Sequence, residues 1–172
     1  MTEMFDFQDG LGPVPAHRHR HFDGSLGGWV ANTATVAPTA VVSPGACVFG
    51  TATVSGRARV TDSARVSGNA VVRDRAWVGG NANVAEHAVV QDNAEVFNDA
   101  HVSDDAVVAG DARVFGGMVF NSARVDGHAI VQGDSWIYGT AQVSGSVIVS
   151  NRSLYKGRYK TQANLPDEAE EA

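Results

Sequence analysis

The string from His17 to His21, His-Arg-His-Arg-His, combines the residue types best suited to binding a metal. In an extended strand, alternate side chains point to the same side, so the three histidines would line one face. Neutral imidazole is a common ligand of zinc, copper, iron and nickel. The first interpretation of this string is a basic loop that packs on the first coil, and no cofactor is predicted. The alternative is a metal site at His17, His19 and His21, shared between chains in a trimer.

Three further histidines, His87, His101 and His128, are spaced 14 and 27 residues apart. A histidine can act as a general base where a pocket holds the hydroxyl or amine of a substrate beside it. These three are the candidate catalytic residues, although no insertion near them would enclose a substrate. Cys47 is the only cysteine, and no base accompanies it in the sequence. We interpret it as a small, outward-facing residue rather than a nucleophile.

A six-residue repeat determines which elements carry these residues. From Val30 to Val114 a valine stands at every sixth position, and from Ala34 onward an alanine stands two residues before each valine. Residues two apart in a strand point the same way, so the alanine and the valine face inward and the residue between them faces outward. Branched valines suit a buried, pleated surface. Glycine, asparagine and aspartate fill many of the intervening positions, where sharp corners need them.

The period is interrupted once, after Val114. We assign Phe120 to the next valine position and Met118 to the alanine position, which leaves a five-residue step to Val125. The spacing of six then returns at Val131, Ile137, Val143 and Val149. Three hexads form one triangular coil, so the pattern predicts an all-β chain folded as a parallel β-helix of about seven coils.

The flanking segments divide the chain into four parts. Residues 1–29, with Phe5 and Phe7 among their apolar side chains, are expected to cap the first coil. Residues 30–149 form the β-helix, and residues 150–163 are expected to cap the last coil. The remaining residues, 164–172, contain four acidic residues and no basic residue, and we expect them to be disordered.

The strict period of six, with aliphatic and small inward residues, resembles that of the hexapeptide-repeat proteins. The resemblance covers residues 30–149 and implies a left-handed parallel β-helix and a trimer. The opening Gly27-Gly28-Trp29-Val30 also resembles a branch of these proteins found in bacteria and phages.

The same resemblance implies two enzymatic activities. Acyltransferases of this superfamily that use coenzyme A place a histidine base in a cleft between subunits, and His87, His101 and His128 are available for that role. The γ-class carbonic anhydrases bind zinc through three histidines, two of them spaced as His-x4-His, and the repeat contains no such pair. If the chain is an enzyme, acyl transfer is therefore the expected activity.

Every third hexad should lie on one face of the prism. On one face the outward residues form an apolar ladder that we expect to contact another subunit: Thr35, Thr53, Val71, Val89 and Val107. A second face carries arginine and aromatic side chains, which are typical of interfaces and can also stack on a nucleotide or a sugar. The candidate ligand-binding residues on it are Arg59, Trp77, Arg113 and Phe115. The third face has no common theme; it carries Cys47, Arg65, Asn83, His101 and Val119.

The net charge of −6 at pH 7 lies mostly in the acidic tail, so the body carries no basic surface for nucleic acid. No apolar run approaches the roughly 20 residues that span a bilayer. The N-terminus lacks the pattern of a secretion signal. We expect a cytoplasmic protein, or a virion component assembled in the cytoplasm, with copies of itself as partner and neither membrane nor nucleic acid among its partners.

The unbroken repeat without loops favours a non-catalytic structural or interaction module, built as a homotrimer. The first alternative is a coenzyme A-dependent acyltransferase with its site between subunits. The second alternative is a protein that binds a nucleotide or a sugar between subunits.

Overall fold

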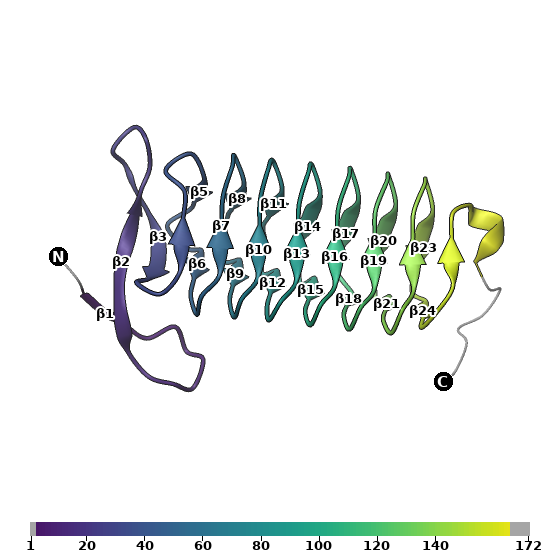
Figure 1. Cartoon of the computed structure of the whole chain (residues 1–172), viewed down its shortest axis with the longest axis horizontal. Coiled ribbons are helices and arrows are strands. Elements are labelled where there is room, and N and C mark those ends of the chain that lie inside the picture. Colours follow the sequence, from purple (N-terminus) through teal and green to yellow (C-terminus); the bar gives the residue numbers. More distant parts are fainter. Residues whose placement is uncertain (1–2, 166–172) are drawn as a thin grey trace.

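The chain forms a parallel β-helix of about seven turns, shown in Figure 1 with its axis horizontal. The computed structural model describes residues 3–165, so the predicted tail lies outside the described residues from residue 166 onward. Three sheets form the sides of the prism, and each receives every third strand of the repeat. The predicted all-β class and the parallel coils are confirmed.

The strands are short because each side of a coil has room for only a few paired residues. Sheet A contains β1 (Glu3–Phe5), β2 (Val14–Arg20), β3 (Leu26–Ala31), β6 (Cys47–Val48), β9 (Arg65–Val66), β12 (Asn83–Val84), β15 (His101–Val102), β18 (Met118–Val119), β21 (Trp136–Ile137) and β24 (Ser153–Leu154). Sheet B contains β4 (Thr35–Val36), β7 (Thr53–Val54), β10 (Val71–Val72), β13 (Val89–Val90), β16 (Val107–Val108), β19 (Arg124–Val125), β22 (Gln142–Val143) and β25 (Arg158–Tyr159). Sheet C contains β5 (Val41–Val42), β8 (Arg59–Val60), β11 (Trp77–Val78), β14 (Glu95–Phe97), β17 (Arg113–Phe115), β20 (Ile130–Gln132) and β23 (Ile148–Ser150). A 3-10 helix, η1 (Gln162–Asn164), follows the last strand.

The interior of the prism is filled by the valines and alanines of the repeat. Val54, Val72 and Val90 stack in successive coils of sheet B, and all three are fully buried. Burying a valine side chain contributes roughly 1.5–3 kcal/mol, and the small alanines leave room at the corners. Outward residues donate their backbone N–H to the next coil, as Val71 N does to Ala88 O at 2.9 Å. The stack between coils therefore supports strands that could not persist alone.

The corners are turned by residues in the left-handed region. Between sheets B and C these are Gly56, Asp74, Asp92 and Gly110 in successive coils, with φ from 62° to 68°. An aspartate here also accepts a backbone N–H one coil further on, as Asp92 Oδ2 does from Gly110 N at 2.9 Å. The glycines and aspartates therefore lie at corners, as the sequence predicts.

The interruption of the repeat lies earlier than predicted. Val119, not Phe120, takes the inward position after Val114: it is fully buried and pairs with Val102. Met118 is the outward residue of the same strand, and Phe120 lies just beyond it. The assignment of Phe120 and Met118 to inward positions, and of Val119 to the outer face, was wrong. The period alone does not show at which corner a residue is missing.

The missing residue belongs to the corner formed by Gly116 and Gly117. Their φ values are 92° and 72°, so two consecutive residues use the left-handed region and close the corner with one residue fewer. A Cβ on Gly117 would collide with the carbonyl oxygen of Ser135 in the next coil. Position 117 therefore accommodates glycine but no residue with a Cβ atom.

The N-terminal segment adds an antiparallel arm to sheet A. β1 pairs with β2 and β2 with β3, before β3 pairs in parallel with β6 (Figure 1). Phe5 stacks on Trp29 and Phe7 on Phe49, with ring centroids 4.4 Å and 4.9 Å apart. The arm thus pairs the first edge of sheet A and packs on the outer face of its first coils.

The segment predicted as a C-terminal cap, residues 150–163, contains two further strands. β24 and β25 extend sheets A and B, and the inward residues Leu154 and Tyr159 are buried. The side-chain amide of Gln162, in η1, donates to Ile148 O and accepts from Ile148 N, both at 2.9 Å. Gln162 therefore takes the place of a next strand at the end of sheet C.

Candidate functional site

The N-terminal histidines lie at the start of the prism, His17 and His19 on β2 and His21 directly after it. His19 Nε2 lies 3.1 Å from Ala40 O, and His21 Nε2 lies 3.1 Å from Val42 O. In later coils the equivalent carbonyl groups accept N–H groups from the coil before. No coil precedes the first one, and an unpaired sheet edge is otherwise open to other chains. His19 and His21 therefore supply contacts that a preceding coil would have made.

These contacts bear on the predicted metal site. The rings of His19 and His21 lie 5.1 Å apart, whereas His17 Nδ1 lies 2.9 Å from Asn32 Oδ1. Within residues 3–165 of one chain, no group of three or more His, Cys, Asp or Glu side chains is arranged to hold a metal ion. A metal shared between chains at His17, His19 and His21 stays a prediction. His21 would have to give up a hydrogen bond to bind it, because its ring nitrogens lie 2.9 Å from Ser25 Oγ and 3.1 Å from Val42 O.

Burial determines the protonation state of His19. The pKa of His19 is lowered from its ordinary value of 6.5, chiefly because burial disfavours the imidazolium ion. The hydrogen bond to Ala40 opposes this shift, while His21 and His17 nearby lower the pKa further. The ring is therefore neutral at pH 7 and can donate its Nε2 proton to the carbonyl group of Ala40.

The three candidate catalytic histidines do not converge within one chain. His101 lies on β15 in sheet A, whereas His87 and His128 lie in turns that join different pairs of sheets. His87 Nε2 is 3.0 Å from Asn69 Nδ2, and His128 Nδ1 is 3.5 Å from Asp111 Oδ2. Both corner histidines are therefore held among polar side chains of neighbouring coils, and a shared catalytic site would need residues from another chain.

Cys47 lies on the outer face of sheet A, but it is only 9% exposed. The N-terminal arm covers it, since it packs in one cluster with Phe7, Ala16 and Phe49. Burial raises the pKa of the Cys47 thiol, and the nearby Arg65 opposes that shift only in part. The thiol is thus protonated at neutral pH and is a poor nucleophile.

The outer face of sheet B carries the predicted valine ladder. Val71 pairs with Val89, and Val89 pairs with Val107, so the three side chains stand in register. Thr53 precedes them on this face and Arg124 follows. At an interstrand spacing of roughly 4.8 Å, the three valines form a strip about 10 Å long. Each is partly exposed, and the strip itself contains no charge.

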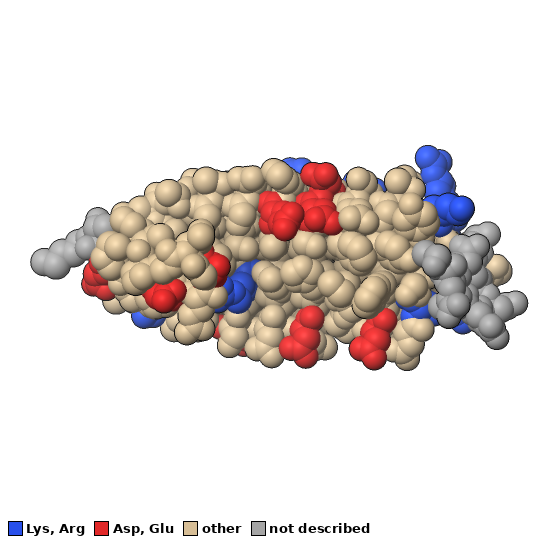
Figure 2. Space-filling view, turned by 90° about the horizontal axis from the view of Figure 1, so that it is seen from below, with Lys and Arg blue, Asp and Glu red and all other residues tan. Residues whose placement is uncertain are grey.

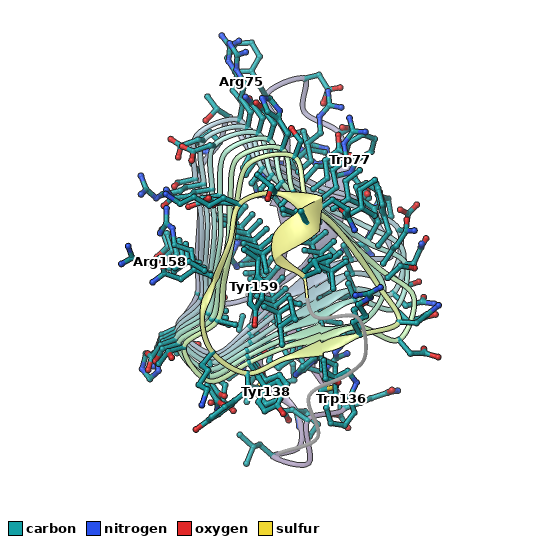
Figure 3. The ribbon with its side chains drawn as sticks, turned by 90° about the vertical axis from the view of Figure 1, so that its right-hand side faces the viewer. Arg75, Trp77, Trp136, Tyr138, Arg158 and Tyr159 are labelled. Atoms are coloured by element: carbon teal, nitrogen blue, oxygen red, sulfur yellow. The ribbon has the colours of Figure 1, made fainter. Side chains whose placement is uncertain are left out.

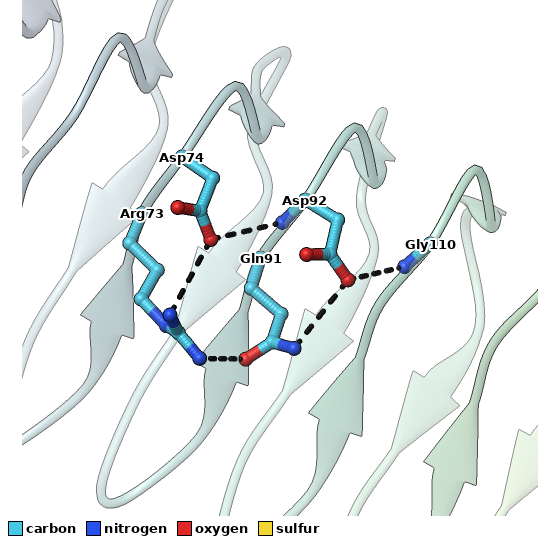
Figure 4. A network of polar contacts seen from close by, with 5 residues as sticks. All are labelled: Arg73, Asp74, Gln91, Asp92 and Gly110. Carbon is cyan, nitrogen blue, oxygen red and sulfur yellow. Dashed lines mark hydrogen bonds and ion pairs between the residues drawn. The ribbon is translucent and has the colours of Figure 1, made fainter.

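Polar side chains border this ladder and neutralise one another. Arg73 donates to Gln91 Oε1 at 2.6 Å and pairs with Asp74 at 3.5 Å (Figure 4). The carboxylates of Asp74 and Asp92 accept backbone N–H groups one coil further on, at 3.4 Å and 2.9 Å. The positive charge of Arg73, beside the valines, is therefore matched by a carboxylate at the same corner.

Sheet C brings the predicted ligand-binding residues onto one face. The guanidinium group of Arg59 lies 5.6 Å from the ring centroid of Trp77. Phe97 packs edge-on against Trp77 at 4.8 Å, and Phe115 follows at 6.2 Å. Trp77 Nε1 also donates to Thr61 Oγ1 at 2.9 Å. These side chains form a strip in which each ring contacts the next coil.

Arg113, the fourth predicted ligand-binding residue, is paired within that strip. It lies in register with Glu95, and its Nε is 3.4 Å from Glu95 Oε2. The expected placement of Glu95 over Arg113, and of Phe97 over Phe115, is confirmed. Because Glu95 neutralises Arg113, Arg113 does not offer an unmatched positive charge to an anionic ligand.

A second group of aromatic residues, on sheet A, was missed by the sequence analysis. Phe120 and Tyr138 stack with ring centroids 5.2 Å apart and planes 9° apart, and Tyr155 follows Tyr138 at 5.2 Å. Trp136 lies on β21 beside them, and Figure 3 shows Trp136 and Tyr138 pointing outward from the same side of the prism. The correct register would have revealed this group. With Val119 in the inward position, Phe120 occupies the same place in its coil as Tyr138 and Tyr155 do in theirs.

Comparisons of this chain with family models, with curated proteins and with solved structures give no match. In the part of the chain that the structure describes, no helix is long and apolar enough to cross a membrane. The parallel β-helix is therefore established by the structure, and the resemblance to hexapeptide-repeat proteins rests on the repeat.

Proposed function

We propose that this chain is a structural module that forms a homotrimer through the outer face of sheet B. Each copy would be a left-handed β-helix of the hexapeptide-repeat type. The observation that carries the proposal is the register of Val71, Val89 and Val107. In Figure 1 no described segment crosses the outer face of this sheet. Three aligned valines on an open face are an apolar surface that a partner would cover.

The surroundings of the ladder support an interface. Small side chains, Ser55 and Ala109, lie beside its ends, whereas Arg73 and Gln91 stand beside its middle. The network of Arg73, Asp74 and Gln91 places polar groups at the margin. An apolar centre with a polar margin is the usual anatomy of a protein–protein interface.

A second copy of the chain fits the periodicity of this face. Outward residues recur at the interstrand spacing of roughly 4.8 Å, and every copy has the same spacing. When three parallel copies turn this ladder toward a common axis, each valine would meet its counterparts from the other two copies at the same height. Three copies around a common axis close the assembly, which prevents open-ended growth.

The test replaces the middle valine by a charged residue. Val89→Lys places a charge at the centre of the ladder, and we expect it to yield folded monomers in light scattering after gel filtration. Val41→Lys is the matched control, because Val41 is also an outward valine but lies on sheet C. A Val89→Lys variant that keeps the mass of the unmodified protein would contradict the proposed interface.

An enzymatic assay addresses the alternative. Acyl transfer from acetyl coenzyme A that disappears in His87→Ala, His101→Ala or His128→Ala, with circular dichroism unchanged, would contradict a purely structural role.

A further inference from the structure

The shortened corner leaves a gap between two carboxylates. Asp99 lies at the corner between sheets C and A in one coil, and Asp134 lies at the same corner two coils later. In the coil between them, Gly117 already occupies the inward position, because its carbonyl oxygen accepts the N–H of His101 as an inward alanine does elsewhere. No residue corresponds to Asp99 and Asp134 in that coil. Two interstrand spacings put the two aspartate backbones about 10 Å apart.

The gap is part of a hollow with a volume of about 460 Å³. Phe115 lines it from sheet C, and Met118 and Trp136 line it from sheet A. Trp136 is 48% exposed, and its ring is turned 75° from that of Phe120. Trp136 therefore contacts the aromatic stack edge-on at Phe120 and keeps a large part of its surface exposed.

The charge around the hollow is one-sided. Its lining contains the carboxylates of Asp99 and Asp134 and no basic side chain. Asp99 accepts a hydrogen bond from the neutral amide of Asn81 at 3.0 Å, and among residues 3–165 neither carboxylate forms an ion pair. Figure 2, seen from the side of sheet A, shows acidic side chains along the margins of a face whose middle carries few charges.

We propose that this hollow binds a small organic cation that carries ammonium groups. The two carboxylates complement positive charge, and an exposed tryptophan ring attracts a weakly hydrated ammonium group through its π face. The thioether of Met118 and the ring of Phe115 offer polarizable, apolar contact to the carbon chain of such a ligand. The separation of Asp99 and Asp134 suits a linear diamine that spans the gap.

The same lining disfavours other ligand classes. A phosphate or carboxylate ligand would face two carboxylates without a compensating base. A hard metal ion prefers a compact set of oxygen ligands, and residues 3–165 contain no group of three suitable side chains. The proposal is independent of the face of sheet B, because the hollow lies at the corner of sheets C and A.

The test is a titration of the full chain with 1,4-diaminobutane, followed by the NMR signals of the tryptophan indole groups. We expect a saturable shift of the Trp136 signal, identified by its loss in Trp136→Phe. Asp99→Asn and Asp134→Asn should each weaken binding about three- to fivefold, as expected for the loss of an exposed ion pair. Asp105→Asn is the matched control, an exposed acidic residue at a different corner, and should leave the affinity unchanged.

A variant with one serine inserted between Gly116 and Gly117 tests the gap itself. The insertion restores the six-residue corner, fills the hollow and should abolish the shift. Unchanged binding in the insertion variant, or in Asp99→Asn and Asp134→Asn, would overturn the proposal. Equally tight binding of magnesium or of the neutral sugar maltose at Trp136 would overturn it as well, and the aspartate variants decide the matter if the insertion variant does not fold.

Discussion

Sheets A and B share the same inward valines, yet their outer faces differ in what lies over them. On the first coils of sheet A, the N-terminal arm packs Phe7 on Phe49 and buries Cys47. On sheet B, Val71 and Val89 stand in register with no described segment across them (Figure 1). The inward residues determine the coil, whereas the outward residues determine which surface each side of the prism can contact.

The N-terminal arm is held on sheet A by interactions that have no counterpart on sheet B. The guanidinium group of Arg65 lies 4.8 Å from the ring centroid of Phe49 and donates to the backbone oxygen of Phe7. One side chain of the helix thus binds both the arm and the ring on which the arm packs. On sheet B the equivalent outward positions carry valine and threonine, such as Val71 and Thr53, which have no comparable reach.

The largest predicted effect comes from removing the central ring of the arm. Phe7 is 1% exposed, and Phe→Ala at a buried site costs about 3–5 kcal/mol. We expect Phe7→Ala to lower the free energy of unfolding by about 3 kcal/mol in urea denaturation. Faster hydrogen exchange should concentrate in the arm and in β3. Phe22→Ala, at a side chain that is 95% exposed, is the control, and an equal loss in both variants would argue against the arm as a cover.

The second prediction concerns substitutions that make the outer face of sheet B less apolar without changing its shape. Replacing Val71, Val89 and Val107 together by threonine exchanges one methyl group for a hydroxyl at each position and keeps the branched side chains that strands favour. If three copies meet on this face, association should weaken by about 2 kcal/mol for each chain, roughly thirtyfold per chain in the association equilibrium. Analytical ultracentrifugation measures this change, with Val41→Thr on sheet C as the control. Unaltered association of the triple variant would show that the ladder is not the interface.

The smallest predicted effect concerns pH and the N-terminal edge. The pKa of His19 in the folded chain lies below its ordinary value of 6.5, so the unfolded chain binds a proton more readily. The stability contributed by neutral His19 is therefore present above about pH 6.5 and is lost as the pH falls through the lower folded pKa. Protection factors of the β5 amides, which follow Ala40, should be lower at pH 5 than at pH 7.5 once they are corrected for the intrinsic pH dependence of exchange. His19→Gln retains an N–H donor without titrating, and an unchanged pH dependence in that variant would count against this role of His19.

The inward pattern of the fold could be predicted because each hexad offers one branched residue and one small residue at a fixed distance. The register after Val114 could not, since Val119 and Phe120 are both apolar and the period fits either. Only the pair Gly116-Gly117 shows which corner is short, and its meaning depends on backbone angles. That error concealed the alignment of Phe120 with Tyr138.

The histidine string shows a different limit of sequence reasoning. The alternation of His17, His19 and His21 correctly suggests an extended strand, and β2 covers the first two of them. The sequence does not show that the carbonyl groups of Ala40 and Val42 lack a preceding coil. Which polar groups need a partner at the end of a repeat is a property of the assembled prism, so the hydrogen-bonding role of these rings became visible only in the structure.

The most direct test of self-association along sheet B is native mass spectrometry of the unmodified protein from neutral, low-salt buffer. The account predicts a single species at three times the chain mass of 18.0 kDa. A species at 18.0 kDa throughout the micromolar range would contradict it.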